Sequence, residues 1–285
     1  MEHYPNGVLL ERGMVQPVNT PYMHSHGYHE LFFLLSGRRR YFVGHTIYDV
    51  APGDLVIIPR TQLHRTAASG GRDYERYLLN FYEEDHPYFG ATLGRETLDT
   101  LLHSGCLEFT PPIARKMQRD LERLERELAA PSAYVRPIAA HILQEILLDA
   151  LCHGRKKEPF RGESANKIQE VARYISSSYA GRITLQEAAQ MAYMEKTYFS
   201  KRFKELTGFG FWEYLTQTRL RAAEQLLRET RLSVGQVAEE CGFCNGNHFG
   251  DSFRRWKGVS PTEYRKQCRG ETQQSGDGRG EIPKI

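Results

Sequence analysis

Two patterns of hydrophobic positions divide the chain. Between His29 and Tyr82, short apolar, aromatic and β-branched runs are separated by Gly and Pro; these runs are ELFFLL, RRRYFVG, DLVIIP and YERYLLNFY. They predict strands at the spacing of an all-β barrel or sandwich. From Pro112 onward, apolar residues recur every three or four positions, which predicts two amphipathic helices over about residues 112–128 and 132–152. We expect these helices to pack on the barrel, to form a dimerisation surface, or to do both.

The pattern changes again after the second helix. Residues 153–164, HGRKKEPFRGES, are polar and contain Pro and Gly, which is typical of an interdomain linker. Residues 165–269 have helical periodicity throughout, whereas residues 270–285 have none and predict a disordered tail. The chain therefore predicts two domains of the α+β class, residues 1–152 with a β-barrel and two helices and residues 165–269 with helices alone.

Length and composition agree with this division. The chain has 285 residues, which suits two domains, and its 40% hydrophobic and 26% charged residues exclude a mostly disordered or collagen-like protein. It has no apolar run long enough to cross a membrane and no signal-peptide pattern at its start, so we expect a cytoplasmic protein without membrane contact. Its five cysteines are an odd number scattered along the chain, which predicts free thiols rather than a disulfide framework.

Positive charge is concentrated in the helical part. Residues 166–269 hold 17 Lys and Arg against 11 Asp and Glu, a balance of +6, while the whole chain is only +3. The remainder is therefore mildly acidic. A basic segment joined to an acidic one indicates that the helical domain meets a polyanion and that the first domain has another role.

The helical part contains an internal repeat. Two stretches align at offsets of 49 and 50 residues: Thr184, Leu185, Ala188 and Ala189 match Ser233, Val234, Val237 and Ala238, and Phe199, Phe203, Gly208 and Tyr214 match Phe249, Phe253, Gly258 and Tyr264. Each unit has a Thr or Ser that caps a short helix, then a turn, then a second helix whose two Phe residues face inward. This order is typical of a helix-turn-helix, and two copies in register argue against an ordinary helical bundle.

In a helix-turn-helix, the second helix enters the major groove of DNA. That helix is predicted at about residues 196–206 in the first unit and at about residues 246–257 in the second. Outward side chains near the start of the helix reach base edges, and basic side chains reach phosphates. The predicted DNA-contacting residues are Thr197, Ser200, Lys201 and Arg202 in the first unit and Asn247, Gly250, Asp251 and Arg254 in the second.

Residues 183–266 resemble the DNA-binding domain of the AraC/XylS family of bacterial transcription regulators. The residues that carry the resemblance are Gly242 and Phe243, Phe253 with Arg254 and Arg255 after it, and the motif GVSPTEYR at residues 258–265. The resemblance implies two recognition helices held by a long helix at about residues 211–228, both meeting one face of double-stranded DNA one turn apart. Asp251 departs from the family, which usually has a basic or polar residue there. It predicts looser binding, repulsion from phosphate, or a carboxylate that accepts a hydrogen bond from a cytosine amino group.

A second motif lies in the strand-rich part. Its residues are His24, His26, Glu30 and Gly37 within MHSHGYHELFFLLSG, followed by Gly53, Pro59 and His64. On a strand, His24 and His26 would point to the same side. The spacing resembles that of the cupin superfamily, in which three His and one Glu hold a divalent metal, although Thr61 and Ala68 replace the usual Gly and Asn. Three His and a carboxylate are chemically able to bind iron, manganese, zinc or nickel.

The alternative is that these side chains line a pocket for a small-molecule effector, or that they have only a structural role. Sensor domains in AraC/XylS regulators commonly keep similar His and Glu residues as hydrogen-bonding groups. The predicted lining residues are His24, His26, Glu30, Arg38, Tyr41 and His64, with Arg40, Tyr77 and Asn80 as further candidates. The resemblance and the many polar groups favour a sugar as the effector.

We therefore expect a transcription regulator, not an enzyme, that binds a specific DNA sequence and responds to a small-molecule effector. A homodimer is expected, an activator that contacts RNA polymerase fits the family, and no cofactor is assigned. One alternative is a metal-dependent cupin enzyme fused to a DNA-binding domain, with His24, His26, Glu30 and His64 as metal ligands. A non-specific architectural DNA-binding protein is the other.

Overall fold

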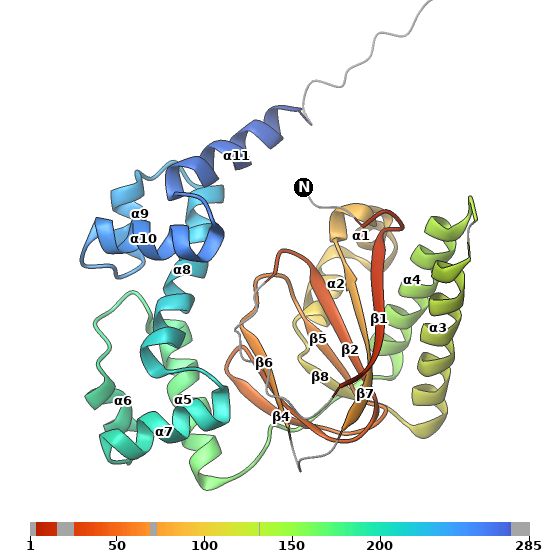
Figure 1. Ribbon diagram of the computed structural model, residues 1–285, viewed down its shortest axis with the longest axis horizontal. Coiled ribbons are helices and arrows are strands. Elements are labelled where there is room, and N and C mark those ends of the chain that lie inside the picture. The colour runs from red at the N-terminus through yellow and green to blue at the C-terminus, as the bar shows by residue number, and fades with distance from the viewer. Residues whose placement is uncertain (1–3, 16–25, 69–72, 131, 275–285) are drawn as a thin grey trace, which may run out of the picture. The chain divides into compact units, whose positions relative to one another are not determined.

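A computed structural model describes residues 4–15, 26–68, 73–130 and 132–274. Within these ranges the chain forms two compact units (Figure 1). The first contains the strands, extends to Glu170 and includes Lys201–Phe209, and the second contains the other helical residues from Val171 onward. This organisation confirms the predicted two-domain α+β class. No helix in these ranges is long and apolar enough to cross a membrane.

The first unit contains two antiparallel sheets that enclose an apolar interior. The six-stranded sheet has the order β1 (Val8–Val15), β7 (Tyr74–Phe81), β2 (His29–Ser36), β5 (Leu55–Ile58), β8 (Cys106–Glu108) and β9 (Arg155–Lys156). The three-stranded sheet has the order β4 (Thr46–Val50), β3 (Arg39–Val43) and β6 (His64–Ala68). Side chains from both sheets meet between them, among them Phe32, Tyr41 and Val56.

Helices cover the other face of the larger sheet. They are α1 (Tyr88–Leu93), α2 (Arg95–Leu102), α3 (Pro111–Ala129) and α4 (Val135–His153), after a short 3-10 helix η1 (Glu83–Asp85). Because successive residues of a strand face opposite ways, Leu31 and Phe33 of β2 pack against the helices while Phe32 faces the interior. The two long helices confirm the prediction; α1, α2 and the strands β1, β4, β6, β8 and β9 are additional.

The first half of the predicted linker, residues 153–164, is bound to the strands of the first unit. Its residues Arg155 and Lys156 form β9 against β8, and the backbone N–H of Lys157 donates to the carbonyl of Cys106 at 2.9 Å. The Lys157 ammonium pairs with buried Asp54. Farther on, the Phe160 ring lies 3.9 Å from the Arg40 guanidinium. Residues 153–164 belong entirely to the first unit, and their polar composition could not show that residues 155–160 are bound to the barrel.

The second half of the chain is helical, as predicted. Its helices are α5 (Glu163–Ser178), α6 (Leu185–Met191), α7 (Lys196–Thr207), α8 (Phe211–Glu229), α9 (Val234–Glu240), α10 (Gly246–Lys257) and α11 (Pro261–Gln274). Because α11 runs to Gln274, the predicted disordered tail is wrong for residues 270–274, and the rest of it lies outside the described residues.

Both units of the internal repeat have the predicted order of cap, short helix, turn and second helix. The hydroxyls of Thr184 and Ser233 each accept a hydrogen bond at 3.2 Å from the backbone three residues on, closing a capping box at the start of α6 and of α9. The Phe pairs of α7 and α10 are fully buried. Gly242 has a φ of +77° in the turn of the second unit, and Tyr193 has +55° at the matching position of the first. The two turns are therefore built alike.

Candidate functional site

Three predicted site residues meet at one end of the barrel interior. Glu30 lies near the start of β2, His64 begins β6, and His26 precedes β2. The Nε2 atom of His26 is 3.2 Å from one carboxylate oxygen of Glu30, and Nε2 of His64 is 4.0 Å from the other. One ligand atom from each residue lies within 4.8 Å of the others. All three side chains are at least nine-tenths buried.

Backbone carbonyls fix both imidazole rings. Nδ1 of His26 lies 2.8 Å from the carbonyl of Tyr28, and Nδ1 of His64 lies 2.9 Å from the carbonyl of Gln62. If Nδ1 carries the proton and donates to the carbonyl, each Nε2 presents a lone pair towards Glu30. Two lone pairs and a carboxylate repel one another unless a proton or a cation lies between them. Metal-ligating histidines are commonly oriented in this way, so the residues present fit a divalent metal.

The charge of Glu30 is stabilised despite its burial. Burial alone would raise the pKa of its carboxyl group. When the imidazoles carry a second proton, on Nε2, the hydrogen bond that His26 donates and the positive charges of His64, His26 and Arg76 outweigh burial and lower the pKa. Glu30 is therefore ionised at neutral pH, and the cluster is an acceptor site for a hydrogen-bond donor or a cation.

The fourth predicted ligand, His24, lies outside the described residues. His26 does not lie on a strand, because β2 begins at His29, so the expectation that strand alternation aligns His24 with His26 is wrong for His26. The ring of His26 instead stacks on Tyr28 at 3.8 Å. The structure thus brings together three of the four predicted residues, and it holds His26 by stacking and by the Tyr28 carbonyl.

Other predicted lining residues divide between the interior and the outside. Tyr41 is buried in the interior cluster, and Asn80 pairs with Glu30 across β7 and β2 and is 5% exposed. Arg38 is exposed at the turn before β3, so its predicted place in the lining is wrong. The buried arginine is the next residue, Arg39, at 0% exposure. A shift of one residue on a strand reverses the face, which explains this error.

Two further candidates also face away from the interior. Arg40 pairs on the outer side of β3 with Asp49 at 2.8 Å. Tyr77 belongs to the helix-side core, and its hydroxyl donates to Glu125 of α3 at 2.7 Å. Arg40 and Tyr77 therefore do not belong to the lining of the interior.

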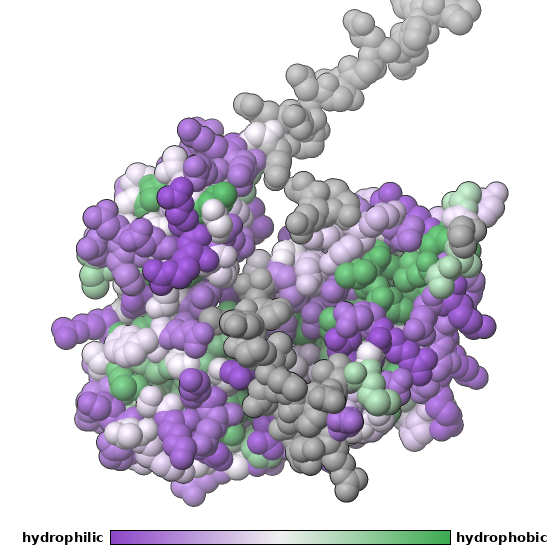
Figure 2. Space-filling view, in the orientation of Figure 1, coloured by the Kyte–Doolittle hydropathy of each residue, from purple (hydrophilic) through white to green (hydrophobic). Residues whose placement is uncertain are grey.

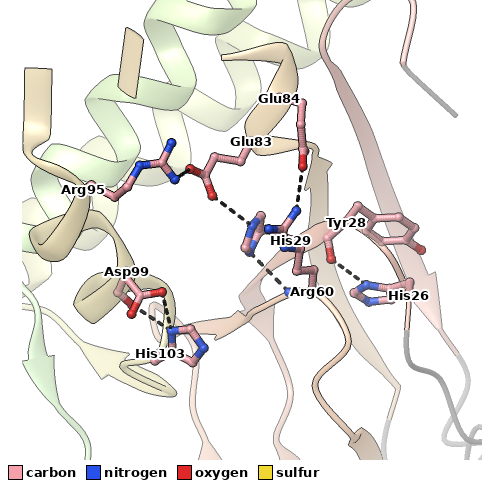
Figure 3. A network of polar contacts seen from close by, with 9 residues as sticks. All are labelled: His26, Tyr28, His29, Arg60, Glu83, Glu84, Arg95, Asp99 and His103. Carbon is pink, nitrogen blue, oxygen red and sulfur yellow. Dashed lines mark hydrogen bonds and ion pairs between the residues drawn. The ribbon is translucent and has the colours of Figure 1, made fainter. Parts of the chain in front are cut away.

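A separate polar network lies next to the cluster (Figure 3). Nδ1 of His29 accepts a hydrogen bond from the Arg60 backbone at 3.3 Å, and its Nε2 lies 4.0 Å from Glu83. Burial, with the nearby charge of Arg60, lowers the pKa of His29 to about 3. His29 is therefore neutral at physiological pH. Figure 3 shows His26 beside Tyr28 and apart from this network, which ties β2 to η1 and, through Arg95, to α2.

The helix α7 carries the predicted DNA-contacting residues of the first unit. With Phe199 and Phe203 facing inward, a turn of 100° per residue places Lys201 opposite them and Thr197 beside it. Both are exposed, Ser200 lies at the flank, and Arg202 is half-buried and pairs with Glu205 at 3.2 Å. The Lys201 side chain is 77% exposed.

Lys204 is a residue that the sequence reasoning missed. It is exposed and lies three residues after Lys201, on the same outward face. The signal was present, because Lys204 matches Arg254 at the repeat offset of 50 residues. A consistent use of the repeat would have included it.

The helix α10 presents a matching face. Asn247, Asp251 and Arg254 are exposed, and Gly250 is partly buried. The side chain of Asn245 caps the helix by accepting from the Asn247 backbone at 2.8 Å. Figure 2 shows mainly hydrophilic residues over α9 and α10. Each outward position of α7 therefore has a counterpart on α10, with Asp251 in place of Lys201.

Comparison with known proteins identifies both parts. A helix-turn-helix domain family matches residues 188–267, and a cupin domain family matches residues 12–75. The chain is 24% identical over 277 residues to the HTH-type transcriptional activator RhaR of Pectobacterium carotovorum, covering 92% of this chain and 91% of that protein.

Other similarities cover the DNA-binding part. The chain is 39% identical over 100 residues to the HTH-type transcriptional regulator YijO of Escherichia coli, and this match covers 35% of each protein. A solved structure, the DNA-binding domain of AdpA in complex with a target DNA, is 31% identical, with a TM-score of 0.37, and the match covers 38% of this chain and 97% of that one.

The order of the two domains is that of an effector-controlled regulator. A cupin domain precedes two helix-turn-helix units of the AraC type, and the relative that matches along nearly the whole chain is a transcriptional activator. The chain is a DNA-binding transcription regulator of the AraC/XylS family with an N-terminal cupin domain.

Proposed function

We propose that α7 and α10 read one DNA site together. The observation that carries this proposal is the matched outward face of the two helices, on which Lys204 corresponds to Arg254 and Thr197 to Asn247. Thr197, Ser200 and Asn247 reach base edges or sugars near the helix starts, Lys201, Lys204 and Arg254 neutralise phosphates, and Arg202 has a smaller part. Asp251 either accepts from a cytosine amino group or weakens the second unit by repulsion.

The effector binds in the barrel interior, beside His26, Glu30 and His64. An ionised, buried carboxylate between two oriented imidazoles offers acceptors to a ligand that carries hydroxyl or amine donors. A sugar, the effector class that the family resemblance favours, suits this chemistry. The protein acts as a regulator and not as an enzyme, in the cytoplasm where its DNA lies.

The regulator acts as a homodimer through α3 and α4. On the exposed side of α4, Leu148 and Leu151 lie about one turn apart and are 39% and 40% exposed, so a dimer that covers them would remove apolar surface from water. Activation through contact with RNA polymerase belongs to the same proposal.

Selection of binding sites from a random duplex library tests this function. The purified protein should enrich one sequence, and a footprint on it should show two protected major-groove segments about one helical turn, roughly 34 Å, apart. A variant with Lys201→Ala and Arg254→Ala should lose the footprint. Uniform protection without discrete sites would instead identify an architectural DNA-binding protein.

A second function is favoured by the geometry of the His26, Glu30 and His64 cluster. Two imidazole Nε2 atoms and a carboxylate within 4.8 Å suit a divalent metal, which would supply Lewis-acid chemistry and would make the first unit a metal-dependent cupin enzyme. Stoichiometric iron or manganese in protein purified without added metal, together with turnover of a small molecule, would favour it over effector binding.

A further inference from the structure

Among the described residues, no carboxylate forms an ion pair with one cationic side chain inside the barrel. Arg39 of β3 is 0% exposed, and neither of its two Nη atoms has a hydrogen-bond partner among the described residues. Its Nε donates to the Thr66 hydroxyl at 3.0 Å, and its guanidinium lies 4.2 Å from the centre of the Tyr74 ring. Thr66 and Tyr74 therefore contact the guanidinium, while both Nη groups remain able to donate hydrogen bonds to a ligand.

No carboxylate of the described first unit is assigned to this charge. Acidic side chains on the strands and turns of the two sheets have other partners: Glu30 pairs with His26, Asp49 with Arg40, Asp54 with Lys157, and Glu75 with Arg12. Residues 16–25 and 69–72, which the structure does not describe, contain no Asp or Glu. A buried charge without a partner is strongly unfavourable, so an anionic ligand that pairs with both Nη groups would stabilise this site.

The chemistry of the site specifies that ligand. Two free Nη groups on one planar guanidinium match the two oxygens of a carboxylate, whose single negative charge this one cation neutralises, whereas a phosphate group can bring a second charge. The surroundings are apolar and aromatic, with Phe32, Tyr41 and Tyr74 in the same cluster. Burial raises the pKa of the Tyr41 hydroxyl well above its usual value, so this group stays neutral beside a bound anion.

We propose that Arg39 binds the carboxylate of an anionic effector whose aliphatic or aromatic body lies between the two sheets. This inference rests on the proposed effector site and narrows its ligand class. Arg39 and His64 lie at opposite ends of the paired strands β3 and β6, four residues or about 13 Å apart along the strand. A ligand with its carboxylate on Arg39 therefore points its far end towards the His26, Glu30 and His64 cluster.

Thermal unfolding of the full chain without ligand gives the first test. Arg39→Met replaces an uncompensated buried charge by an apolar side chain of similar length, so we expect its melting temperature to be higher than that of the wild type. Arg38→Met removes the same charge from the exposed neighbouring position and should leave the melting temperature within about 1 °C. A lower melting temperature for Arg39→Met would show that Arg39 is only a structural group stacked on Tyr74.

Matched ligands give the second test. Phenylacetate and hexanoate, at 10 mM, should raise the melting temperature of the wild type by about 2 °C or more for at least one of them, since a ligand bound only by the native state stabilises it. The neutral isosteres phenylacetamide and hexanamide should bind at least about tenfold more weakly, and Arg39→Met should respond to none of the four. Equal shifts with acid and amide, no shift with either acid, or an unchanged response of Arg39→Met would each overturn the proposal.

The same measurement separates this inference from the proposed function. If neutral polyols stabilise the wild type and Arg39→Met equally and also change DNA affinity, the effector site stands and the anionic ligand is wrong. If an acid binds at Arg39 without changing DNA affinity, the anion site stands and the proposed control of DNA binding is wrong.

Discussion

The carboxylate of Glu30 lies 3.2 Å from Nε2 of His26, although the two side chains are only 8% and 10% exposed. Both imidazoles around Glu30 use Nδ1 towards a backbone carbonyl, so their remaining nitrogens must share protons or a cation with this one carboxylate. Any ligand that adds a donor or a cation here changes the protonation of the cluster. Glu30 is therefore the residue through which binding in the barrel is most easily detected.

Glu30→Gln should abolish the effector response and leave DNA affinity without effector unchanged. The amide keeps the volume of the side chain, but it replaces one of two acceptor oxygens with a donor that faces the imidazoles. We expect a loss of about 1–3 kcal/mol in the free energy of unfolding of the first unit, because a buried pair is broken. DNA titrations with and without effector check the response, and urea unfolding checks the stability.

Metal analysis of the same two proteins distinguishes the two readings of the cluster. Substoichiometric metal in wild type and variant agrees with an effector pocket. One metal per chain in the wild type and its loss in Glu30→Gln would contradict that assignment and favour a metal centre. A normal effector response in the variant, with no metal in either protein, would leave the cluster with a structural role only.

On the DNA side, Lys201→Ala and Lys204→Ala should each weaken binding to a selected site. If each lysine contacts a phosphate, the salt dependence of binding falls by about one unit per variant and all sequences weaken alike. A base contact would instead relax one position of the site. Arg202→Ala should have a smaller effect, because Arg202 is half-buried and pairs with Glu205. Fluorescence anisotropy at several salt concentrations measures both quantities.

The control for these variants is Arg161→Ala. Arg161 is an exposed cation in the connecting segment, outside the helix-turn-helix units, so its removal changes the net charge by the same amount. The Arg161→Ala variant should bind DNA with an affinity close to that of the wild type. Equal losses for Arg161→Ala and Lys201→Ala would mean that only the total charge matters and that α7 makes no particular contact.

The helical half was predictable because its signals are local and repeated. Thr184 and Ser233 begin helices by their own side-chain hydrogen bonds, and the Phe pairs recur at a fixed offset. The short elements of the first half had no such signals. β6 reads HRTAA and β9 consists of two basic residues, and both form strands only because a partner strand lies beside them.

The candidate site was predictable in kind but not in register. Glu30 and His64 were found from spacing, whereas the run Arg38 to Arg40 offers three identical side chains and no sign of which one faces inward. The apolar neighbours could have resolved this, because Tyr41 and Val43 share a face with Arg39 and not with Arg38. His26 required tertiary information, since its position depends on stacking with Tyr28.

The buried His29 predicts a specific pH dependence of stability. Its pKa is lowered from 6.5 to about 3 by burial and by Arg60, so the unfolded chain binds the proton more readily than the folded one between these pH values. The contribution is fully present above about pH 6.5 and is lost as the pH falls towards 3. Between pH 7 and 4.5 the free energy of unfolding of the wild type should fall by about 1–2 kcal/mol more than that of His29→Gln, as measured by urea unfolding. His103→Gln, at an exposed position of the same region, should follow the wild type.

Charge on the outer face of α4 tests the dimer. Leu148 and Leu151 lie on that face, and Glu at both positions should yield monomers in sedimentation experiments on the full chain, because two carboxylates would have to be buried at the interface. Thr100→Glu adds a charge at an exposed position of α2 and should leave the oligomeric state unchanged. Dimers that persist in the α4 variant would place the interface elsewhere.

Gly242 should be indispensable to the second helix-turn-helix unit. Its φ is +77°, and a Cβ atom at this position would lie 2.5 Å from the backbone oxygen of Ala180, which no rotation of a side chain can relieve. Tyr193, at the matching turn of the first unit, shows that a positive φ alone is tolerated, so the close approach to Ala180 is the decisive difference. We expect Gly242→Ala to lower the free energy of unfolding by at least about 2 kcal/mol and to weaken DNA binding, because α10 follows this turn.

Gly235→Ala, in α9, is the matched control: its Cβ would meet only the Ser233 hydroxyl at 4.0 Å, and it should stabilise the helix by about 0.5 kcal/mol. If chemical denaturation shows the same change for both variants, the contact with Ala180 does not constrain the turn.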